Sequence, residues 1–390
     1  MKRVLLVQPS MQPPGGGNGV AAWVLQALVP EHRVTVLSWR PVEIDPINRF
    51  FGTHLRRGDF DTIEVPRRYR TLMDHLPIPA TLIKLSLLMR YTRKVSGGFD
   101  VIFGVHNETD FGRRGIQYVH YPTYLRPRPK VDLRWYHPPQ PGLNAYYALA
   151  DRIAGFSLDR MKANVTLVNS DWTGEHVSRF LGIKTRTLYP PVADPAPGLP
   201  WDQRRNAFLA VGRISPEKDY ARVMTILARV RERVPDLTLT IVGTWDRHAR
   251  SYLNSLRALA RSLGSWIEFR NDVTRDEMRG LMASSRYGIH GMAEEHFGMA
   301  PAELARAGCV VWVPAGGGQM EIVGREPALM FTSDDDAVGK IAKTLTDDAE
   351  QRRLRELLAA RSEQFSTARF MAQVRELVDT FTPAGGSEDR

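Results

Sequence analysis

The stretch Glu294-Glu295-His296-Phe297-Gly298-Met299-Ala300-Pro301-Ala302-Glu303 guides the interpretation of the whole chain. Two carboxylates, Glu295 and Glu303, lie eight positions apart across a glycine and the start of a predicted helix. Gly308 is placed to end that helix, and the apolar run 309–313 predicts the strand that follows. Such carboxylates can contact two parts of one ligand, while amides at the helix start bind an anion between them. The segment therefore predicts a binding site for a sugar nucleotide.

Strands alternate with helices on both sides of a proline-rich stretch at 189–200. Predicted strands lie at 4–8, 33–39, 99–105, 115–120, 164–169, 207–211, 237–242, 266–269, 287–290 and 310–313. Predicted helices lie at 20–28, 143–156, 220–234, 248–263, 275–284 and 300–307. This order favours an α/β chain of two doubly wound, Rossmann-like domains that face each other across a cleft.

The proline-rich stretch is the best candidate for a linker, since proline ends regular structure. We therefore expect an N-terminal domain at 1–190 and a C-terminal domain at 191–365, to which the resemblance described below assigns acceptor binding and nucleotide-sugar binding, respectively. A C-terminal helix at 366–382 is expected to pack back on the N-terminal domain, and 383–390 to form a disordered tail.

Composition excludes several classes of protein. The chain has 390 residues, 43% of them hydrophobic and 25% charged, as in globular proteins. A single cysteine, Cys309, excludes a disulfide framework and a cysteine-based zinc site, and it is expected to be a small buried hydrophobe. The first apolar run is short and predicts a strand rather than a signal peptide, and no run of 18 apolar residues exists. A cytoplasmic protein is expected.

Positive charge is concentrated in the first half of the chain. Residues 1–190 hold 26 Lys and Arg against 15 Asp and Glu, whereas residues 191–390 hold 27 against 28. The first half is thus expected to face an anionic membrane surface or a phosphorylated acceptor; no motif indicates nucleic-acid binding. Segment 67–94 combines basic and apolar residues. It predicts either an interfacial amphipathic segment or a core helix with a basic solvent face.

Several motifs occur together in one order along the chain. They are Gly15-Gly16-Gly17-Asn18-Gly19, Val168-Asn169-Ser170, Val211-Gly212-Arg213 with Glu217-Lys218, Ile241-Val242-Gly243, Glu295 with Glu303, and Gly316-Gly317-Gly318 with Glu321-Ile322-Val323. With these motifs the chain resembles the retaining glycosyltransferases of family 4, which have the GT-B architecture. Three motifs are similar to those of the mannosyltransferases that extend dolichol-linked oligosaccharides with α-1,2-mannose. They are Tyr118-Val119-His120-Tyr121-Pro122-Thr123, Tyr189-Pro190-Pro191-Val192 and Glu295-His296-Phe297-Gly298.

The resemblance implies a metal-independent hexosyltransferase that retains anomeric configuration and needs no cofactor beyond a nucleotide-sugar donor. The three mannosyltransferase-like motifs imply GDP-mannose as the donor. The acceptor would be a hydroxyl of a lipid-linked or other glycan. Peripheral binding to the inner membrane face is expected. Two alternatives stay open, namely a glycosyltransferase with a soluble small-molecule acceptor and a non-catalytic sugar-nucleotide-binding protein.

Cations and glycines follow the predicted strands where a diphosphate would bind. Arg213 and Lys218 are expected to stabilise the charge of the leaving nucleoside diphosphate. Glycine lets backbone amides approach a phosphate closely. On that ground the donor-binding candidates include Gly16, Gly17 and Gly19, and a second phosphate nest at Gly317 and Gly318.

The resemblance assigns the remaining candidates. It implies that Glu295 holds hydroxyls of the donor sugar and that Glu303 holds those of the ribose, although Glu294 could take the role of Glu295. It places His120 beside the transferred sugar as a catalytic residue, and His106 is a candidate acceptor contact. The other donor-binding candidates are Gly212, His296, Phe297, Gly298 and Met299.

Chemistry of another class is disfavoured. A nicotinamide enzyme needs an acidic residue at the end of its second strand, and here that strand ends Ser38-Trp39-Arg40. No cluster of metal ligands stands out, and Asp334-Asp335-Asp336 is interpreted as helix capping and solvated charge. Because Arg213, Lys218 and Glu303 are all present, no group that glycosyl transfer needs is missing.

Overall fold

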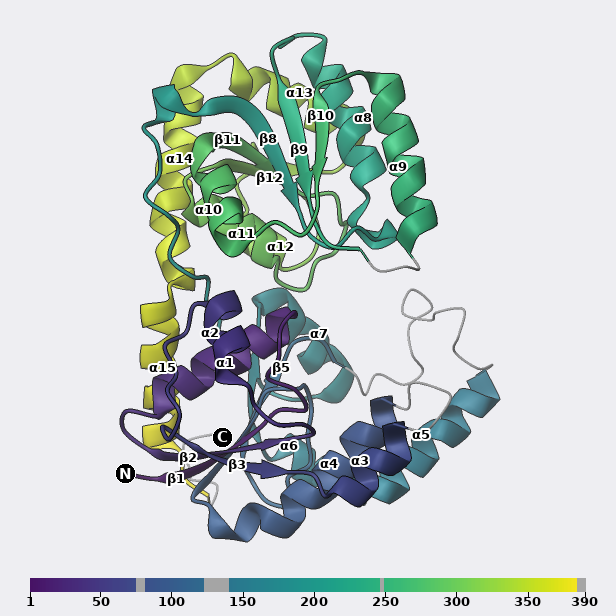
Figure 1. Cartoon of the computed structure of the whole chain (residues 1–390), viewed down its shortest axis with the longest axis vertical. Helices are drawn as coiled ribbons and strands as arrows, with labels where there is room; N and C mark the ends of the chain where they lie inside the picture. The colour runs from purple at the N-terminus through teal and green to yellow at the C-terminus, as the bar shows by residue number, and fades with distance from the viewer. Residues whose placement is uncertain (75–80, 123–139, 246–248, 384–390) are drawn as a thin grey trace. The chain divides into compact units, whose positions relative to one another are not determined.

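The computed structural model describes residues 1–74, 81–122, 140–245 and 249–383, and it divides into two compact units (Figure 1). Unit 1 comprises Met1–Pro191 and Phe370–Arg390, and unit 2 comprises Val192–Arg369. Each unit is described by itself. From residue 384 onward, the predicted disordered tail lies outside the described residues. Thr123, the last residue of the motif Tyr118–Thr123, also lies outside them.

Unit 1 is built on a sheet of seven parallel strands in the order β3-β2-β1-β4-β5-β6-β7. Its central strands have side chains buried on both faces, which explains their continuous apolar sequences. The strands are β1 (Arg3–Val7), β2 (Arg33–Ser38), β3 (Asp61–Glu64), β4 (Val101–Gly104), β5 (Ile116–Val119), β6 (Val165–Val168) and β7 (Arg186–Thr187).

Helices cover both faces of this sheet. The helices of unit 1 are α1 (Gly16–Leu28), α2 (Ile44–Phe51), α3 (Arg67–Asp74), α4 (Thr81–Val95), α5 (Gln140–Ala154), α6 (Leu158–Lys162) and α7 (Asp171–Leu181), with a 3-10 turn η1 (Ser96–Gly98). One apolar core joins Val4 and Leu6 of β1 to α1 and α2. The opposite core joins Leu5 and Val7 of the same strand to α3 and α4. The alternation along β1 therefore separates the two layers.

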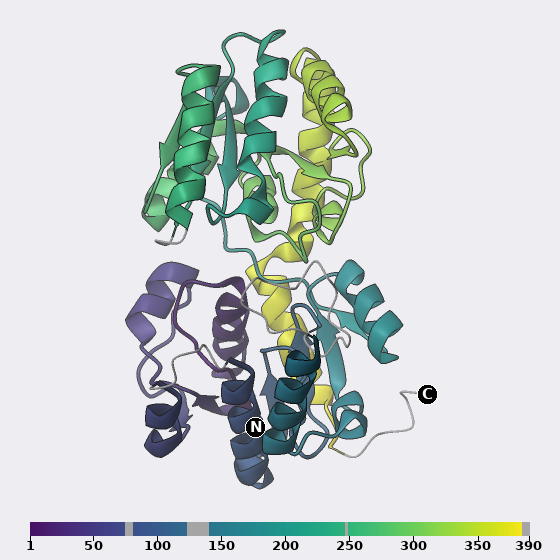
Figure 2. The ribbon, with the colours of Figure 1, turned by 90° about the vertical axis from the view of Figure 1, so that its right-hand side faces the viewer.

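The C-terminal helix α15 (Thr367–Thr380) belongs to the core of unit 1. Phe370 and Val374 are buried beside the side chains of α1, and Arg375 donates to the carbonyl oxygen of Ala27 at 2.9 Å. The ammonium group of Lys2 donates to three carbonyl oxygens at the end of α15, which satisfies groups that a helix end leaves unpaired. Figure 2 shows this yellow helix running along unit 1.

Unit 2 repeats the plan with six parallel strands in the order β10-β9-β8-β11-β12-β13. They are β8 (Arg205–Val211), β9 (Thr238–Val242), β10 (Ile267–Arg270), β11 (Ser285–Ile289), β12 (Val310–Pro314) and β13 (Met330–Phe331). In both sheets the strand order reverses direction beside the first strand, as in nucleotide-binding folds. The predicted pair of doubly wound domains is confirmed at the level of each sheet.

The helices of unit 2 lie on both sides of its sheet (Figure 1). They are α8 (Tyr220–Arg231), α9 (Arg250–Leu263), α10 (Arg275–Ser284), α11 (Met299–Arg306), α12 (Gln319–Ile322), α13 (Asp334–Leu345) and α14 (Asp348–Ser362), with 3-10 turns η3 (Trp201–Gln203), η4 (Pro216–Lys218) and η6 (Glu363–Phe365). Asp334, Asp335 and Asp336 form the first turn of α13, where acidic groups stabilise a helix start. Within the described residues, no helix has the length and apolar character needed to cross a membrane.

The structure differs from the sequence prediction at the start of α1, at short edge strands and at helices such as α7 and α14, which lie outside the predicted helices. The predicted loop before residue 20 is partly helical, because α1 begins at Gly16. Strands β3, β7 and β13 were not predicted, since they are short or lie at sheet edges. The proline-rich stretch is largely irregular, but Val192 pairs with Ser366 through a β-bridge.

Candidate active site

The loops at the carboxyl ends of β8 and β11 hold the main group of candidate residues in unit 2. These two strands are neighbours at the point where the strand order of the sheet reverses. Open α/β sheets bind ligands at such points. The loop after β8 leads into η4 with Lys218, and the loop after β11 contains Glu295. The fold therefore brings together two candidates that are distant in sequence.

Lys218, Glu295 and His290 form one polar cluster. The ammonium group of Lys218 is ion-paired with Oε2 of Glu295. Nε2 of His290 lies 3.1 Å from the same oxygen. The side chains are largely enclosed, with exposed fractions of 15% for Lys218 and 20% for Glu295. Because the carboxylate is an acceptor, the neutral imidazole of His290 carries its proton on Nε2.

The electrostatics of the cluster keep Glu295 ionised. Burial alone would raise the pKa of Glu295, but the hydrogen bond from His290 and the charge of Lys218 outweigh it and lower the pKa to about 2. Burial also lowers the pKa of His290, although Glu295 opposes the shift, so that the ring is neutral near pH 7. Glu295 is thus a carboxylate that accepts hydrogen bonds across the physiological range, and it is not placed to act as a general acid.

Glycines allow these loops to approach each other. A Cβ atom on Gly291 would lie 2.6 Å from the carbonyl oxygen of Lys218 and 2.8 Å from that of Asp219. The amides of Gly212 and Ile214 donate to the end of β9 at 3.0 and 2.9 Å. Close backbone contacts of this kind exclude a side chain, which explains why glycine occurs at Gly291.

Gly316, Gly317 and Gly318 support the Glu295 loop rather than forming an open nest. Gly317 forms a β-bridge with Glu295, and the amide of Gly318 donates to the carbonyl oxygen of Glu295 at 2.7 Å. The following helix α12 has only four residues. The interpretation of Gly318 as a phosphate-binding amide therefore needs correction, because its N–H already has a backbone partner in this structure.

The other donor-binding candidates of unit 2 have different surroundings. The side chain of Phe297 is buried and packs edge-on against Phe365 at 5.6 Å, so it is a core residue rather than a ligand contact. Gly298 has φ +107° and precedes α11, whereas Met299 is the first residue of that helix. His296 is half-buried. Gly212 directly follows strand β8 and has φ +150°.

Arg213 and Glu294 do not join the cluster. The guanidinium of Arg213 is 75% exposed and lies 3.6 Å from Glu217 in an i,i+4 ion pair. Glu294 is exposed, whereas Glu295 is enclosed by Lys218 and His290. Of the two adjacent glutamates, Glu295 is thus the one that the fold directs into the cluster.

Glu303 occupies a separate environment on α11. Burial raises the pKa of Glu303 to about 7, and the nearby Arg275 opposes this shift only in part. Arg275 is the first residue of α10. Near neutral pH the Glu303 carboxyl group is therefore divided between its neutral and ionised forms, whereas Glu295 is fully ionised.

The candidates of unit 1 gather at the start of α1 and the end of β5. Gly15 precedes α1 with φ +140°, and Gly16, Gly17 and Gly19 lie in the first turns of the helix. A Cβ atom on Gly17 would lie 3.0 Å from Nε2 of His120, so the absent side chain makes room for the imidazole ring. No acidic side chain occupies the first turn of α1. Its N-terminal amides are therefore suited to an anion.

The two candidate histidines of unit 1, His106 and His120, have different surroundings. His120 is half-buried; its Nε2 lies 2.9 Å from the carbonyl oxygen of Val105, and Asn107 accepts its backbone amide. His106 is buried, with Nδ1 3.2 Å from the Val7 oxygen and Nε2 3.3 Å from Oγ1 of Thr109. Burial lowers the pKa of His106 to about 4. Since both ring nitrogens have protein partners, His106 supports the loop and is not placed to contact an acceptor.

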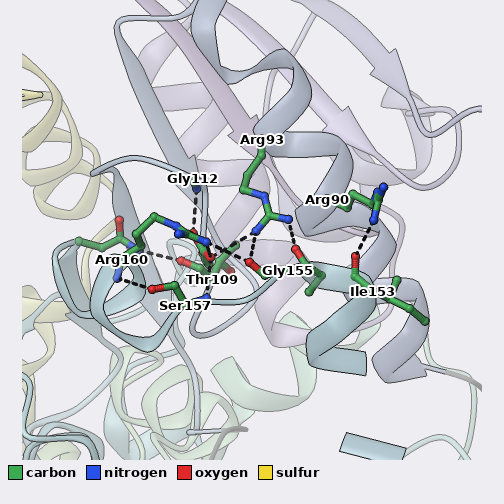
Figure 3. A network of polar contacts seen from close by, with 11 residues as sticks. Arg90, Arg93, Thr109, Gly112, Ile153, Gly155, Ser157 and Arg160 are labelled. Carbon is green, nitrogen blue, oxygen red and sulfur yellow. Dashed lines mark hydrogen bonds and ion pairs between the residues drawn. The ribbon is translucent and has the colours of Figure 1, made fainter. Parts of the chain in front are cut away.

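The basic segment at α3 and α4 is partly structural. Figure 3 shows Arg93 of α4 beside Gly155 at the end of α5, where its guanidinium donates to the carbonyl oxygens of Ala154 and Gly155. The buried Asp110 accepts hydrogen bonds from Arg93 at 3.3 Å and from Arg160 at 2.8 Å. Leu88 and Met89 of α4 are buried. Of the two predictions for segment 67–94, the core helix with a basic solvent face fits the described residues.

One group of potential metal ligands exists within the described residues, namely Glu31, His32 and Asp379. No sequence motif indicates this group, because Asp379 lies on the C-terminal helix, far along the chain from Glu31 and His32. The Lys2 amide donates to Nδ1 of His32, so the neutral ring carries its proton on Nε2, which faces Asp379 at 3.4 Å. A protonated Nε2 is not a metal ligand. Nε2 and the Asp379 carboxylate oxygen are close without a hydrogen bond, and with its proton on Nε2 the ring does not complete a metal site.

Comparison with known proteins identifies unit 2. Residues 196–359 match the family model for glycosyl transferases group 1. These residues form a glycosyltransferase group 1 domain. The matched segment contains Lys218, His290, Glu295 and Glu303. The polar cluster at the ends of β8 and β11 is thus part of the family's own domain.

The curated relatives described here are named for one and the same enzymatic activity. The human GDP-Man:Man(3)GlcNAc(2)-PP-Dol alpha-1,2-mannosyltransferase is 27% identical over 235 residues, which are 55% of this chain and 47% of the relative. The protein of that name from Dictyostelium discoideum is 26% identical over 261 residues, or 62% and 48%. The chain thus spans about half the length of the curated relatives it matches. The predicted resemblance to these mannosyltransferases is confirmed.

Solved structures confirm the GT-B fold of the two domains. Anabaena HepE, solved in complex with UDP and glucose, has a TM-score of 0.65 at 16% identity and covers 98% of this chain and 100% of its own. WaaG, a glycosyltransferase involved in lipopolysaccharide biosynthesis, has a TM-score of 0.67 at 16% identity with the same coverage. At these identities the likeness establishes the fold alone.

Sequence reasoning missed His290 as a member of the cluster. A signal existed, since His290 ends the predicted strand 287–290, directly before Gly291 and the glutamate loop. A polar residue at the carboxyl end of a strand beside the switch point is placed to meet a ligand. The motif Glu294–Glu303 begins four residues after His290 and therefore does not include it.

Proposed function

We propose that this chain transfers a mannosyl group from GDP-mannose to a hydroxyl group of a lipid-linked glycan. The single observation that carries the proposal is the enclosed cluster of Lys218, Glu295 and His290 inside the matched glycosyltransferase domain. The names of the relatives supply the donor and the acceptor class.

In the proposed reaction Lys218 stabilises the leaving diphosphate. As the glycosidic bond breaks, negative charge grows on the diphosphate oxygen, and a fixed ammonium group stabilises that charge more than the ground state. In the structure this ammonium is paired with Glu295. Binding of the donor would therefore exchange one anionic partner of Lys218 for another and release Glu295 to accept hydrogen bonds from sugar hydroxyls.

Glu303 is proposed to hold the ribose hydroxyls, and His120 to lie beside the transferred sugar. The N-terminal amides of α1 would bind an anionic group of the donor or of the acceptor, since their helix carries no acidic cap. Retention of configuration, independence of metal ions and the absence of a further cofactor belong to the same proposal. Because His106 has protein partners for both ring nitrogens, it supports these residues indirectly.

A basic surface on unit 1 is proposed to bind anionic membranes at the cytoplasmic face. Arg67, Arg68, Arg90 and Lys94 are exposed, whereas the apolar side chains of Leu88 and Met89 are buried in the unit. The proposed attraction is therefore electrostatic and does not involve insertion of α4 into lipid.

Transfer of radioactive mannose tests the proposal. Purified protein is incubated with GDP-mannose labelled in the sugar and with extracted membrane lipids, and label is measured in the organic phase and in water-soluble products. We expect label in the organic phase with GDP-mannose and none with labelled UDP-glucose. Label in a water-soluble glycoside would contradict the lipid acceptor, and tight donor binding without transfer would indicate a non-catalytic binding protein.

A further inference from the structure

The hydroxyl group of Tyr220 is a buried donor that the proposed mechanism has not used. Tyr220 begins α8 and is only 3% exposed, and its Oη has no hydrogen-bond partner among the described residues. Other buried tyrosines differ, since the hydroxyl of Tyr118 donates to Leu188 at 2.7 Å and that of Tyr287 donates to Gln351 at 3.2 Å. An unsatisfied buried hydroxyl is unfavourable and indicates a group that a ligand completes.

This hydroxyl lies at the site already described. A Cβ atom on Gly212 would lie 3.0 Å from Oη of Tyr220 and 3.8 Å from Cε of Lys218. The hydroxyl and the Lys218 stem therefore both border the position that a side chain on Gly212 would occupy, beside the end of β8. The ammonium at the end of that stem is paired with Glu295. The stem of Lys218 and the Tyr220 hydroxyl thus flank Gly212, while the Lys218 ammonium contacts Glu295.

The surroundings favour the protonated hydroxyl. Burial raises the pKa of Tyr220, and the neighbouring groups Tyr252 and Glu295 raise it further. At neutral pH the group is therefore an O–H donor. A donor that lacks a protein acceptor is best satisfied by a charged oxygen, because hydrogen bonds to ionised groups are the stronger ones. A phosphate oxygen of a nucleoside diphosphate has this chemistry.

We propose that the Tyr220 hydroxyl donates a hydrogen bond to a phosphate oxygen of the donor nucleotide when Lys218 leaves Glu295 for the same diphosphate. This inference rests on the proposed function, because it assumes that a nucleoside diphosphate binds beside Gly212. Tyr220 is then a donor-binding residue. Because its hydroxyl has no partner among the described residues, removing it costs the fold no hydrogen bond.

The substitution Tyr220→Phe removes only this hydroxyl. Because the group lacks a partner, thermal denaturation should show the ligand-free variant to be as stable as the wild-type protein or more stable. Isothermal titration with GDP should show a dissociation constant raised about 10- to 100-fold, as expected for loss of a hydrogen bond to a charged group. The matched control Tyr287→Phe loses a hydrogen bond to Gln351. It should be less stable and should bind GDP as the wild-type protein does.

The outcomes separate the inference from the function on which it rests. If wild-type protein binds none of GDP, UDP and ADP, the proposed function fails and the inference fails with it. If wild-type protein binds GDP and Tyr220→Phe binds it equally well, only the role of Tyr220 is wrong. A clear loss of stability in ligand-free Tyr220→Phe would also contradict the inference, because it would show that the hydroxyl already has a partner.

Discussion

The ammonium group of Lys218 is ion-paired with the carboxylate of Glu295, although 77 positions separate the two residues in the chain. The pair joins the loop after β8 to the loop after β11. Under the proposed function, Lys218 would contact the diphosphate of the donor and Glu295 its sugar. The pair thus fixes the two loops against each other, and in the proposed reaction the donor would separate its members.

Lys218→Ala should abolish most of the transferase activity. Removal of a fixed cation from the leaving group is expected to lower kcat by about 10²- to 10³-fold, as loss of one transition-state contact does in other enzymes. Steady-state measurement of GDP release with GDP-mannose and acceptor lipid checks this. Lys340→Ala is the matched control, because Lys340 pairs with Asp336 in the same unit and away from the cluster. Near-normal kcat in Lys218→Ala would contradict the leaving-group role.

Glu295→Gln should destabilise the protein in a pH-dependent way. The folded pKa of Glu295 is about 2, compared with an ordinary value of 4.5. A lowered carboxyl pKa stabilises the folded state above about pH 4.5, and this contribution is lost as pH falls towards about 2. At pH 7 the loss should be about 2 kcal/mol, since partial exposure weakens a pair that would be worth more when fully buried.

Chemical denaturation of wild-type protein and Glu295→Gln at a series of pH values measures that difference. The two free energies of unfolding should converge as pH falls from 4.5. A constant difference between the two proteins over this range would show that Glu295 is not held ionised by Lys218 and His290.

Glu303→Gln should have the opposite pH signature. The pKa of Glu303 is raised from 4.5 to about 7, so the folded protein keeps a proton that the unfolded chain releases in this range. The stability of the wild-type protein should therefore fall as pH rises between about 4.5 and about 7 relative to Glu303→Gln, which cannot ionise. Denaturation curves recorded at pH 5, 6 and 7 check this, and parallel pH profiles would refute the raised pKa.

Gly317→Ala should displace the Glu295 loop. Gly317 has φ +74°, and a Cβ atom there would overlap the backbone of Glu295. We expect lower thermal stability and a loss of activity, since the carboxylate would move away from Lys218. Gly339→Ala is the control, because Gly339 lies within α13 with open space around it and alanine favours helices. Full activity in Gly317→Ala would mean that the loop position is not required.

Binding to anionic vesicles should depend on exposed arginines of α3. The double variant Arg67→Glu and Arg68→Glu should recover less protein in flotation with phosphatidylglycerol vesicles at low salt, and salt should weaken wild-type binding. Arg353→Glu serves as a control on unit 2, where Arg353 is paired with Glu350 and Glu326. Equal flotation of all three proteins would refute the basic surface.

The fold could be predicted because its signals are local. The apolar runs of β1 and β8 and the glycines after them indicate buried strands and tight turns without knowledge of distant contacts. The predicted start of α1 is too late because glycine weakens helix propensity, whereas in the fold His120 and Phe51 lie where side chains on Gly17 and Gly19 would project, so that glycine is the residue that fits there.

The site could be predicted only in part because its contacts are non-local. The motifs indicated Lys218 and Glu295 as candidates, but not that they pair with each other, since chain separation hides such a contact. Chain separation also hides the hydrogen bond from the Gly318 amide to the carbonyl oxygen of Glu295. It likewise hides the packing of Phe297 against Phe365, which lies near the start of α15. Burial, which sets the different pKa values of Glu295 and Glu303, also follows from the assembled fold.

Thermal denaturation of the purified protein with GDP, UDP and ADP tests the central claim most directly. A nucleotide that binds only the folded protein raises its melting temperature. The account predicts that GDP stabilises the wild-type protein clearly, and that Lys218→Ala loses most of this effect. Absence of stabilisation by all three nucleotides would contradict a donor site formed by Lys218, Glu295 and His290.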